Sequence, residues 1–139
     1  MDTKVSRYIF RGKRKDNGEW VYGSLIQRRI WKSEFYVIRV TDNGFNSYEE
    51  YEVIPETIGQ YTGLTDKNGT KIFEGDIVSC NSRTDCANMV VIFECGQFRM
   101  VIAEKYYNYV ESCGFYDINC FEKSVIGNIH DNPELLKGE

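Results

Sequence analysis

The chain has one histidine, His130, and any acid–base or nucleophilic catalysis that needs an imidazole must use it. Asp131 follows it directly, and one of five cysteines could act as the nucleophile of such a set. No spacing in the sequence selects one cysteine as the partner. A surface or capping role is therefore the favoured interpretation of His130.

A second candidate for chemistry is the carboxylate pair Glu74 and Asp76, which flanks Gly75. In a strand the two side chains would share a face, where paired carboxylates can act as acid and base or bind a cation. The alternative is a tight turn in which Asp76 accepts hydrogen bonds from backbone N–H groups. Because the sequence also contains no Gly-rich phosphate loop, H-E-x-x-H motif or nucleophile elbow, we predict that the protein is not an enzyme.

The cysteine spacing argues against a metal site. The closest pairs, Cys80 with Cys86 and Cys113 with Cys120, have five and six residues between them, whereas structural zinc sites favour C-x-x-C pairs. With Cys95 the cysteines number five, an odd count without a secretory signal, so reduced thiols are expected. The sequence predicts no metal, no cofactor and no small-molecule substrate.

Charge is unevenly distributed along the chain. Residues 1–39 carry ten Lys or Arg and four Asp or Glu, a net charge of +6, whereas residues 40–139 carry seven and seventeen, a net charge of −10. The basic part could attract an anionic partner or a second copy packed head to tail, or the two parts could simply neutralise each other.

Basic clusters near Trp20, Tyr22 and Trp31 could form an aromatic, cationic surface for nucleic acid. The cations concerned are Lys13, Arg14, Lys15, Arg28 and Arg29. This hypothesis requires that all five converge on one face. A pI of about 5.1 and a solvated-turn explanation for each cluster argue against it.

Three tyrosines, Tyr106, Tyr107 and Tyr109, are candidates for a protein interface, where tyrosine is enriched. Packing between two parts of the protein explains them equally well. Either interpretation places this aromatic cluster among residues that contact another surface.

Alternating apolar residues and turn dipeptides predict a protein made of strands. Strands are expected over 7–11, 20–26, 30–40, 76–80, 89–94, 97–103, 115–121 and 124–129. Residues 81–88 are polar and predict a loop. Asn132 and Pro133 predict the cap and first residue of one short helical turn near the C-terminal end of the sequence.

The stretch Ile58–Val78 is the most distinctive string in the chain. Asp66, Asn68 and Gly69 lie in a turn, because Asn and Gly tolerate positive φ and Asp bonds its own backbone. Four glycines, Gly59, Gly63, Gly69 and Gly75, recur every four to six residues, which opposes a helix and favours a winding connector. Gly75 and Asp76 form a second corner that leads into a strand. These residues are predicted to be structural.

Three parts of the sequence together resemble the YopX family, small proteins encoded by phages and prophages. The resemblance lies in 57–64, 66–69 and 72–78 in the centre, in 10–13 and 20–25 near the start, and in 125–129 and 132–136 near the end. It implies a small, mainly β protein of a mobile element, without an established catalytic activity and without catalytic residues to carry over.

From these observations we expect an all-β fold of two small packed β subdomains in a single YopX-like domain over 1–139. Residues 1–56 are expected to form a β meander, and residues 57–139 the connector and an SH3-like barrel. The expected function is a non-enzymatic phage or prophage protein that acts in the cytoplasm of its bacterial host. We expect it to bind a protein or copies of itself, with nucleic acid as the alternative partner. No apolar run is long enough for a membrane span.

Overall fold

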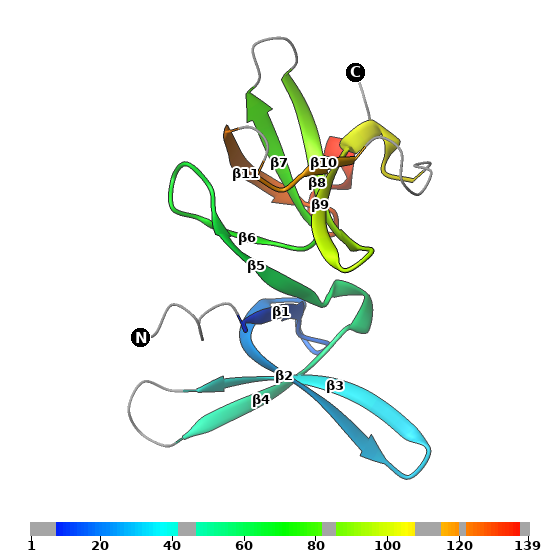
Figure 1. Ribbon diagram of the computed structural model, residues 1–139. Coiled ribbons are helices and arrows are strands. Elements are labelled where there is room, and N and C mark those ends of the chain that lie inside the picture. Colours follow the sequence, from blue (N-terminus) through cyan, green and yellow to red (C-terminus); the bar gives the residue numbers. More distant parts are fainter. Residues whose placement is uncertain (1–7, 42–46, 82–85, 108–114, 120–121, 137–139) are drawn as a thin grey trace. The chain divides into compact units, whose positions relative to one another are not determined.

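The structure, a computed structural model, describes residues 8–41, 47–81, 86–107, 115–119 and 122–136. Strands dominate these residues, and the chain divides into two compact units, Met1–Tyr61 and Thr62–Glu139 (Figure 1). Strand order in the first sheet is β4-β3-β2-β1-β5-β6, and the unit boundary falls within β5. The second sheet has the order β10-β9-β8-β7-β11.

The first unit is an antiparallel meander followed by a single 3-10 turn. Its elements are β1 (Phe10–Lys13), β2 (Trp20–Ile30), β3 (Ser33–Thr41), β4 (Tyr48–Val53) and η1 (Pro55–Thr57). Thr57 ties η1 to the sheet, because its hydroxyl donates to the carbonyl of Ile54 at 2.6 Å and accepts the N–H of Lys13 at 2.9 Å. Ile38 and Val53 form the buried centre of this unit.

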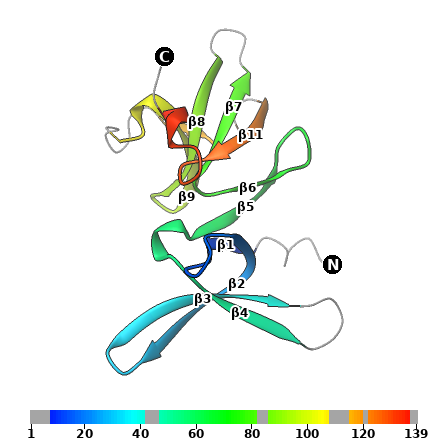
Figure 2. The ribbon, with the colours of Figure 1, turned by 180° about the vertical axis from the view of Figure 1, so that it is seen from behind.

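A β hairpin opens the second unit and a five-stranded antiparallel sheet follows it. The hairpin strands are β5 (Gly59–Thr65) and β6 (Lys71–Phe73). The sheet strands are β7 (Asp76–Asn81), β8 (Cys86–Glu94), β9 (Gln97–Ile102), β10 (Phe115–Asp117) and β11 (Glu122–Asn128). Two 3-10 turns, η2 (Ala103–Lys105) and η3 (Pro133–Leu136), complete the unit, the latter drawn in red in Figure 2.

Both faces of the five-stranded sheet are buried, which explains why its strands are apolar at consecutive positions. One cluster contains Ile72, Val78, Cys80, Met89, Val91 and Met100. The other contains Ile77, Val90, Ile92, Val101, Ala103 and Leu136. Because successive side chains of a strand point to opposite faces, Ile77 and Val78 belong to different clusters, one covered by β6 and the other by η3.

The predicted all-β fold is confirmed, including one short helical turn that begins at Pro133. The SH3-like barrel is not confirmed, because neither sheet closes within the described ranges. The strands predicted over 30–40 and 115–121 were too long, because β3 begins at Ser33 and β10 ends at Asp117. Other strands are longer than predicted or were not predicted: β2 continues from Ile26 to Ile30, β4 occupies an acidic stretch that was not predicted as a strand, and β8 begins at Cys86, inside the predicted loop. Pairing partners extended these strands beyond their local propensity.

Candidate protein-interaction site

Asp66 lies in the most distinctive part of the sequence. The hydrogen bonds that its carboxylate accepts in the structure all stabilise the fold. Oδ1 accepts the backbone N–H groups of Asn68 at 2.8 Å and Thr70 at 2.9 Å, which closes the turn. Oδ2 accepts the N–H of Val125 in β11 at 2.8 Å. Gly69 has a φ of +84°, which explains its place in this turn. One buried carboxylate therefore joins the β5–β6 hairpin to β11.

The environment of Asp66 lowers the pKa of its carboxyl group. Burial by itself would raise the pKa, but the N–H donors of Val125, Thr70 and Asn68 stabilise the charged form and outweigh it. The side chain is only 7% exposed. Asp66 is thus an ionised structural residue, as the turn chemistry predicted.

The second predicted corner, at Gly75 and Asp76, is also built into the backbone. Asp76 is 2% exposed, and its Oδ2 accepts the N–H of Phe73 at 2.8 Å. Gly75 has a φ of +92°, donates to the carbonyl of Val91 at 2.8 Å and accepts the N–H of Ile129 at 3.0 Å. Because Asp76 is directed into the turn, the Glu74–Asp76 pair is not available as a catalytic pair of carboxylates.

The closing residues of the sequence form a third self-contained turn. The carboxamide oxygen of Asn128 accepts the N–H groups of His130 at 3.0 Å and Asp131 at 2.9 Å. The side chain of Asn132 occupies the space where a Cβ on Gly127 would lie, 2.4 Å from its Oδ1, and that oxygen accepts the N–H of Asn128 at 3.2 Å. His130 and Asp131 are therefore parts of a capped turn that leads into η3.

The two cysteines whose side chains the structure describes, Cys80 and Cys95, do not form a catalytic or metal-binding set with these residues. Cys80 is buried in the sheet, and burial raises the pKa of its thiol, which opposes thiolate chemistry. Cys95 is exposed at the two-residue turn between β8 and β9, in a left-handed conformation (φ +53°) beside Gly96 (φ +76°). Cys113 and Cys120 lie outside the described residues, and so does the side chain of Cys86. Among the described residues no group of three or more His, Cys, Asp or Glu is arranged to hold a metal ion.

The five cations proposed for nucleic acid do not gather on one face of the first sheet. Lys13 of β1 lies opposite Trp20 of β2, so these two side chains point to the same face of the sheet. Side chains alternate along β2, which puts Arg28 on the same face as Trp20 and Lys13, while Arg14 and Arg29 project from the other face. The pairs at 13–14 and 28–29 are also far apart along β2, because Arg28 lies eight positions beyond Trp20, about 27 Å of extended strand.

Most of these cations also have a partner within the fold. Arg14 binds Asp16 at 2.7 Å and stacks over the Tyr51 ring, and Lys15 binds Glu52 at 3.1 Å. Arg28 holds both carboxylate oxygens of Glu50, which lowers the pKa of that carboxyl group. The Nζ of Lys13 lies 5.5 Å from the centre of the Trp20 ring. The side chain of Arg29 is 72% exposed, and its Nε is 3.9 Å from a carboxylate oxygen of Glu34, a weak contact. Nucleic-acid binding stays a prediction, without a single basic face to support it.

The predicted tyrosine interface divides into two parts. Tyr106 packs against the buried cluster that η3 covers, and burial raises the pKa of its hydroxyl group. Tyr107 is 74% exposed and meets Tyr106 edge-on, with ring centres 5.1 Å apart. Tyr109 lies outside the described residues. Tyr107 is thus accessible to a partner, whereas Tyr106 is partly buried against the core.

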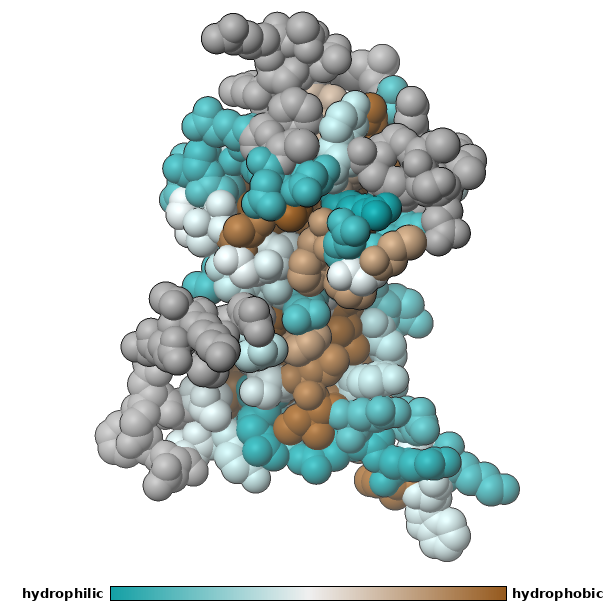
Figure 3. All heavy atoms as spheres, in the orientation of Figure 1, coloured by the Kyte–Doolittle hydropathy of each residue, from teal (hydrophilic) through white to brown (hydrophobic). Residues whose placement is uncertain are grey.

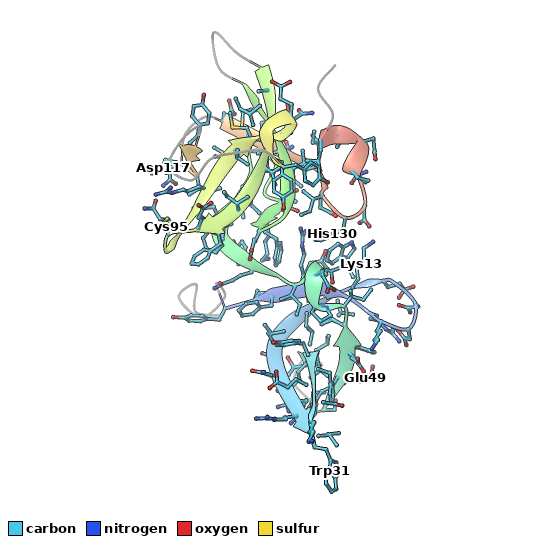
Figure 4. The ribbon with its side chains drawn as sticks, turned by 90° about the vertical axis from the view of Figure 1, so that its right-hand side faces the viewer. Lys13, Trp31, Glu49, Cys95, Asp117 and His130 are labelled. Carbon is cyan, nitrogen blue, oxygen red and sulfur yellow. The ribbon has the colours of Figure 1, made fainter. Side chains whose placement is uncertain are left out.

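The most exposed large apolar side chain among the described residues is that of Trp31, which entered the sequence-based predictions only as an aromatic neighbour of the basic clusters. Trp31 is 93% exposed at the turn between β2 and β3, and its neighbour Ile30 is 60% exposed. Figure 4 shows the Trp31 side chain directed away from the strands at the end of this hairpin. In Figure 3 the same end carries a small hydrophobic area bordered by hydrophilic residues. An aromatic side chain there is fully available for contact.

We define the hairpin tip as residues 28–35, where β2 and β3 continue as a two-stranded ribbon. β1 pairs with β2 only up to Gly23, and β4 pairs with β3 only from Tyr36 onward. The three pairs from Arg28–Phe35 to Ile30–Ser33 therefore have no third strand beside them in the described part of the chain. They carry Trp31 about 10 Å beyond the last three-stranded part of the sheet.

Trp31 also has an unfavourable backbone conformation. The loop between Ile30 and Ser33 contains two residues, and Trp31, the first of them, has a φ of +57°. In such a hairpin glycine is the usual residue at a positive φ, and a side chain there costs about 1 kcal/mol or more. Trp31 thus combines backbone strain with exposure of an indole ring, and neither stabilises the fold.

Sequence reasoning placed Ile30 and Trp31 inside a strand because the pair Trp31–Lys32 contains none of the residues typical of a turn. The available signal was the apolar pair Ile30–Trp31 between Arg29 and Lys32, an unusual combination for a surface strand.

Comparisons with known proteins place the fold. A family model described as YopX protein matches residues 9–137. A solved structure of protein EF1440 from Enterococcus faecalis is 23% identical in sequence, with a TM-score of 0.52, and the match covers 92% of this chain and 96% of that one. No curated protein matches. At this identity the solved structure shows a shared fold. In the described residues no helix has the length and apolar character needed to cross a membrane.

Proposed function

The chain belongs to the YopX family, and we propose that it is a non-enzymatic accessory protein of a phage or prophage that acts in the bacterial cytoplasm by binding another protein or further copies of itself. The observation that supports this proposal is the exposure of a large aromatic side chain, Trp31, in a protein whose buried carboxylates, Asp66 and Asp76, serve the fold. Tryptophan and tyrosine are the residues most enriched where proteins contact one another.

The contrast between buried and exposed groups gives the proposal its physical basis. Asp66 and Asp76, the buried acids of the second unit, hold backbone N–H groups, and Cys80 is buried with a raised thiol pKa. These groups are therefore engaged in stabilising the protein. The exposed indole ring of Trp31 has the residue type and the accessibility of a contact side chain.

The experiment that tests the proposal is capture of partners by the tagged full chain from a lysate of the bacterium whose genome carries the gene, at low and at high salt. We expect one protein, or the untagged chain itself, to be retained at both salt concentrations. Nucleic acid retained at low salt and released steeply at high salt would instead support the nucleic-acid alternative, since counterion release drives such contacts. Turnover of a substrate by the purified chain would contradict the non-enzymatic proposal.

A further inference from the structure

The hairpin tip combines four properties that rarely coincide in a residue without a function outside its own fold. Trp31 is nearly fully exposed, it has a positive φ, it extends beyond the three-stranded part of the sheet, and it lies between two cations. A backbone outlier at an exposed bulky residue points to a function, because the fold alone would favour glycine or asparagine there.

The charges around Trp31 indicate what kind of surface it contacts. Arg29 and Lys32 flank the Ile30–Trp31 pair, and both are exposed. The Nε of Arg29 is 3.9 Å from a carboxylate oxygen of Glu34, too far for a strong ion pair at an exposed site. The tip therefore presents an apolar centre between positive charges. A complementary surface has an apolar pocket with carboxylates around its opening.

Nucleic acid fits these observations less well than a protein does. Binding to a phosphate backbone gains strength from several cations acting together. In this unit Arg14, Lys15 and Arg28 are each bound to a carboxylate of their own sheet or turn. Two exposed cations beside one indole ring provide little electrostatic attraction for a phosphate backbone. A tryptophan that becomes buried on binding, with charged neighbours, is typical of a dominant contact between proteins.

We propose that the hairpin tip is the binding site for a partner protein, that Trp31 and Ile30 insert into an apolar pocket of that protein, and that Arg29 and Lys32 contact carboxylates around the pocket. The inference rests on the proposed function and assigns it to one site. The second exposed aromatic surface, at Tyr107, is not part of this site.

The experiment compares partner capture by the full-length wild-type chain with capture by three variants. Trp31→Gly removes the ring and fits the backbone conformation, Tyr107→Ala removes an exposed ring elsewhere, and Arg29→Glu with Lys32→Glu reverses the flanking charge. We expect Trp31→Gly and the charge reversal each to lower retention of the same protein at least tenfold. We expect Tyr107→Ala to retain it within twofold.

A benzophenone amino acid in place of Trp31, and a matched one in place of Tyr107, then locate the contact by photo-cross-linking. The proposal predicts a cross-link from position 31 to a partner surface with apolar and acidic residues, and none from position 107. Undiminished retention by Trp31→Gly would overturn the proposed site while leaving a protein-binding function intact. A cross-link from position 31 to nucleic acid, or to another copy of this chain, would also overturn it. Failure of the wild-type chain to retain any protein would contradict the proposed function as well.

Discussion

Two turns of this protein, the one around Asp66 and the one at Trp31, use their residues in opposite ways. At Asp66 a buried carboxylate accepts three backbone N–H groups, and the glycine at the strained position, Gly69, suits its positive φ. At Trp31 a bulky ring occupies the positive-φ position and is exposed to solvent. The first turn stabilises the fold, whereas the second holds a side chain that the fold does not need. The distinctive part of a sequence is therefore not by itself its binding site.

The largest effect is expected from Asp66→Ala. Three N–H groups lose their acceptor, so the unfolding free energy of the second unit should fall by about 3 kcal/mol. This change lowers the equilibrium constant for folding more than a hundredfold. Amide hydrogen exchange of β7, β8 and β9, followed by mass spectrometry, measures this loss. Asp16→Ala is the control, because Asp16 is exposed and its loss should leave stability nearly unchanged. Equal protection in both variants would remove the structural role assigned to Asp66.

Acid should weaken the second unit through the same carboxylate. The pKa of Asp66 is lowered in the folded state, so its contribution is fully present above the unfolded-state pKa, about 4, and is lost as the pH falls through the folded-state value. Urea unfolding by circular dichroism between pH 6 and pH 2 should show this loss. In Asp66→Asn the decline should be smaller, and an identical decline in both proteins would contradict the assignment.

Gly127→Ala should destabilise the closing turn by about 1–2 kcal/mol, because the new Cβ would displace the Asn132 carboxamide from its bond to the Asn128 N–H. Since both changes remove one contact, the substitution should have little further effect in an Asn132→Ala background. Thermal unfolding of the two single variants and the double variant measures the coupling. Additive losses would mean that the carboxamide is not what Gly127 accommodates.

The smallest effect is expected from Glu50→Gln. Glu50 binds Arg28 and lies 3.5 Å from Arg39, but these side chains are partly exposed, so the loss of stability should be small, and smaller still at high salt. Urea unfolding followed by tryptophan fluorescence measures this loss. A salt-independent loss would indicate a packing role for Glu50 instead of an electrostatic one.

Local turn chemistry explains why the fold class and several turns could be predicted from the sequence. Asp66 with Gly69, Gly96 in the turn between β8 and β9, and Asn132 with Pro133 are residues that their backbone conformations favour. Alternating apolar residues placed most of the strands of the second unit. The SH3-like barrel could not be predicted reliably, because closure of a sheet depends on strand pairs far apart in the sequence.

The hairpin tip and the cation partners depend on information that a sequence window lacks. Trp31 was assigned to a strand since no residue beside it favours a turn, and the register of β2 with β3 decides where the chain reverses. The pairing of Arg28 with Glu50, 22 residues later, likewise depends on tertiary structure. β4 was missed because its glutamates have low strand propensity and are accommodated by pairing with β3.

The most direct test of the account is urea unfolding of Trp31→Gly beside the wild-type chain, with Trp20 as the fluorescent reporter of the first unit in the variant and far-ultraviolet circular dichroism in both. Since Trp31 contributes strain and exposed surface, we predict an unfolding free energy that is unchanged or higher by up to about 1 kcal/mol. A fall of more than about 1 kcal/mol would show that Trp31 stabilises the fold, and would contradict the claim that this side chain is held for a partner.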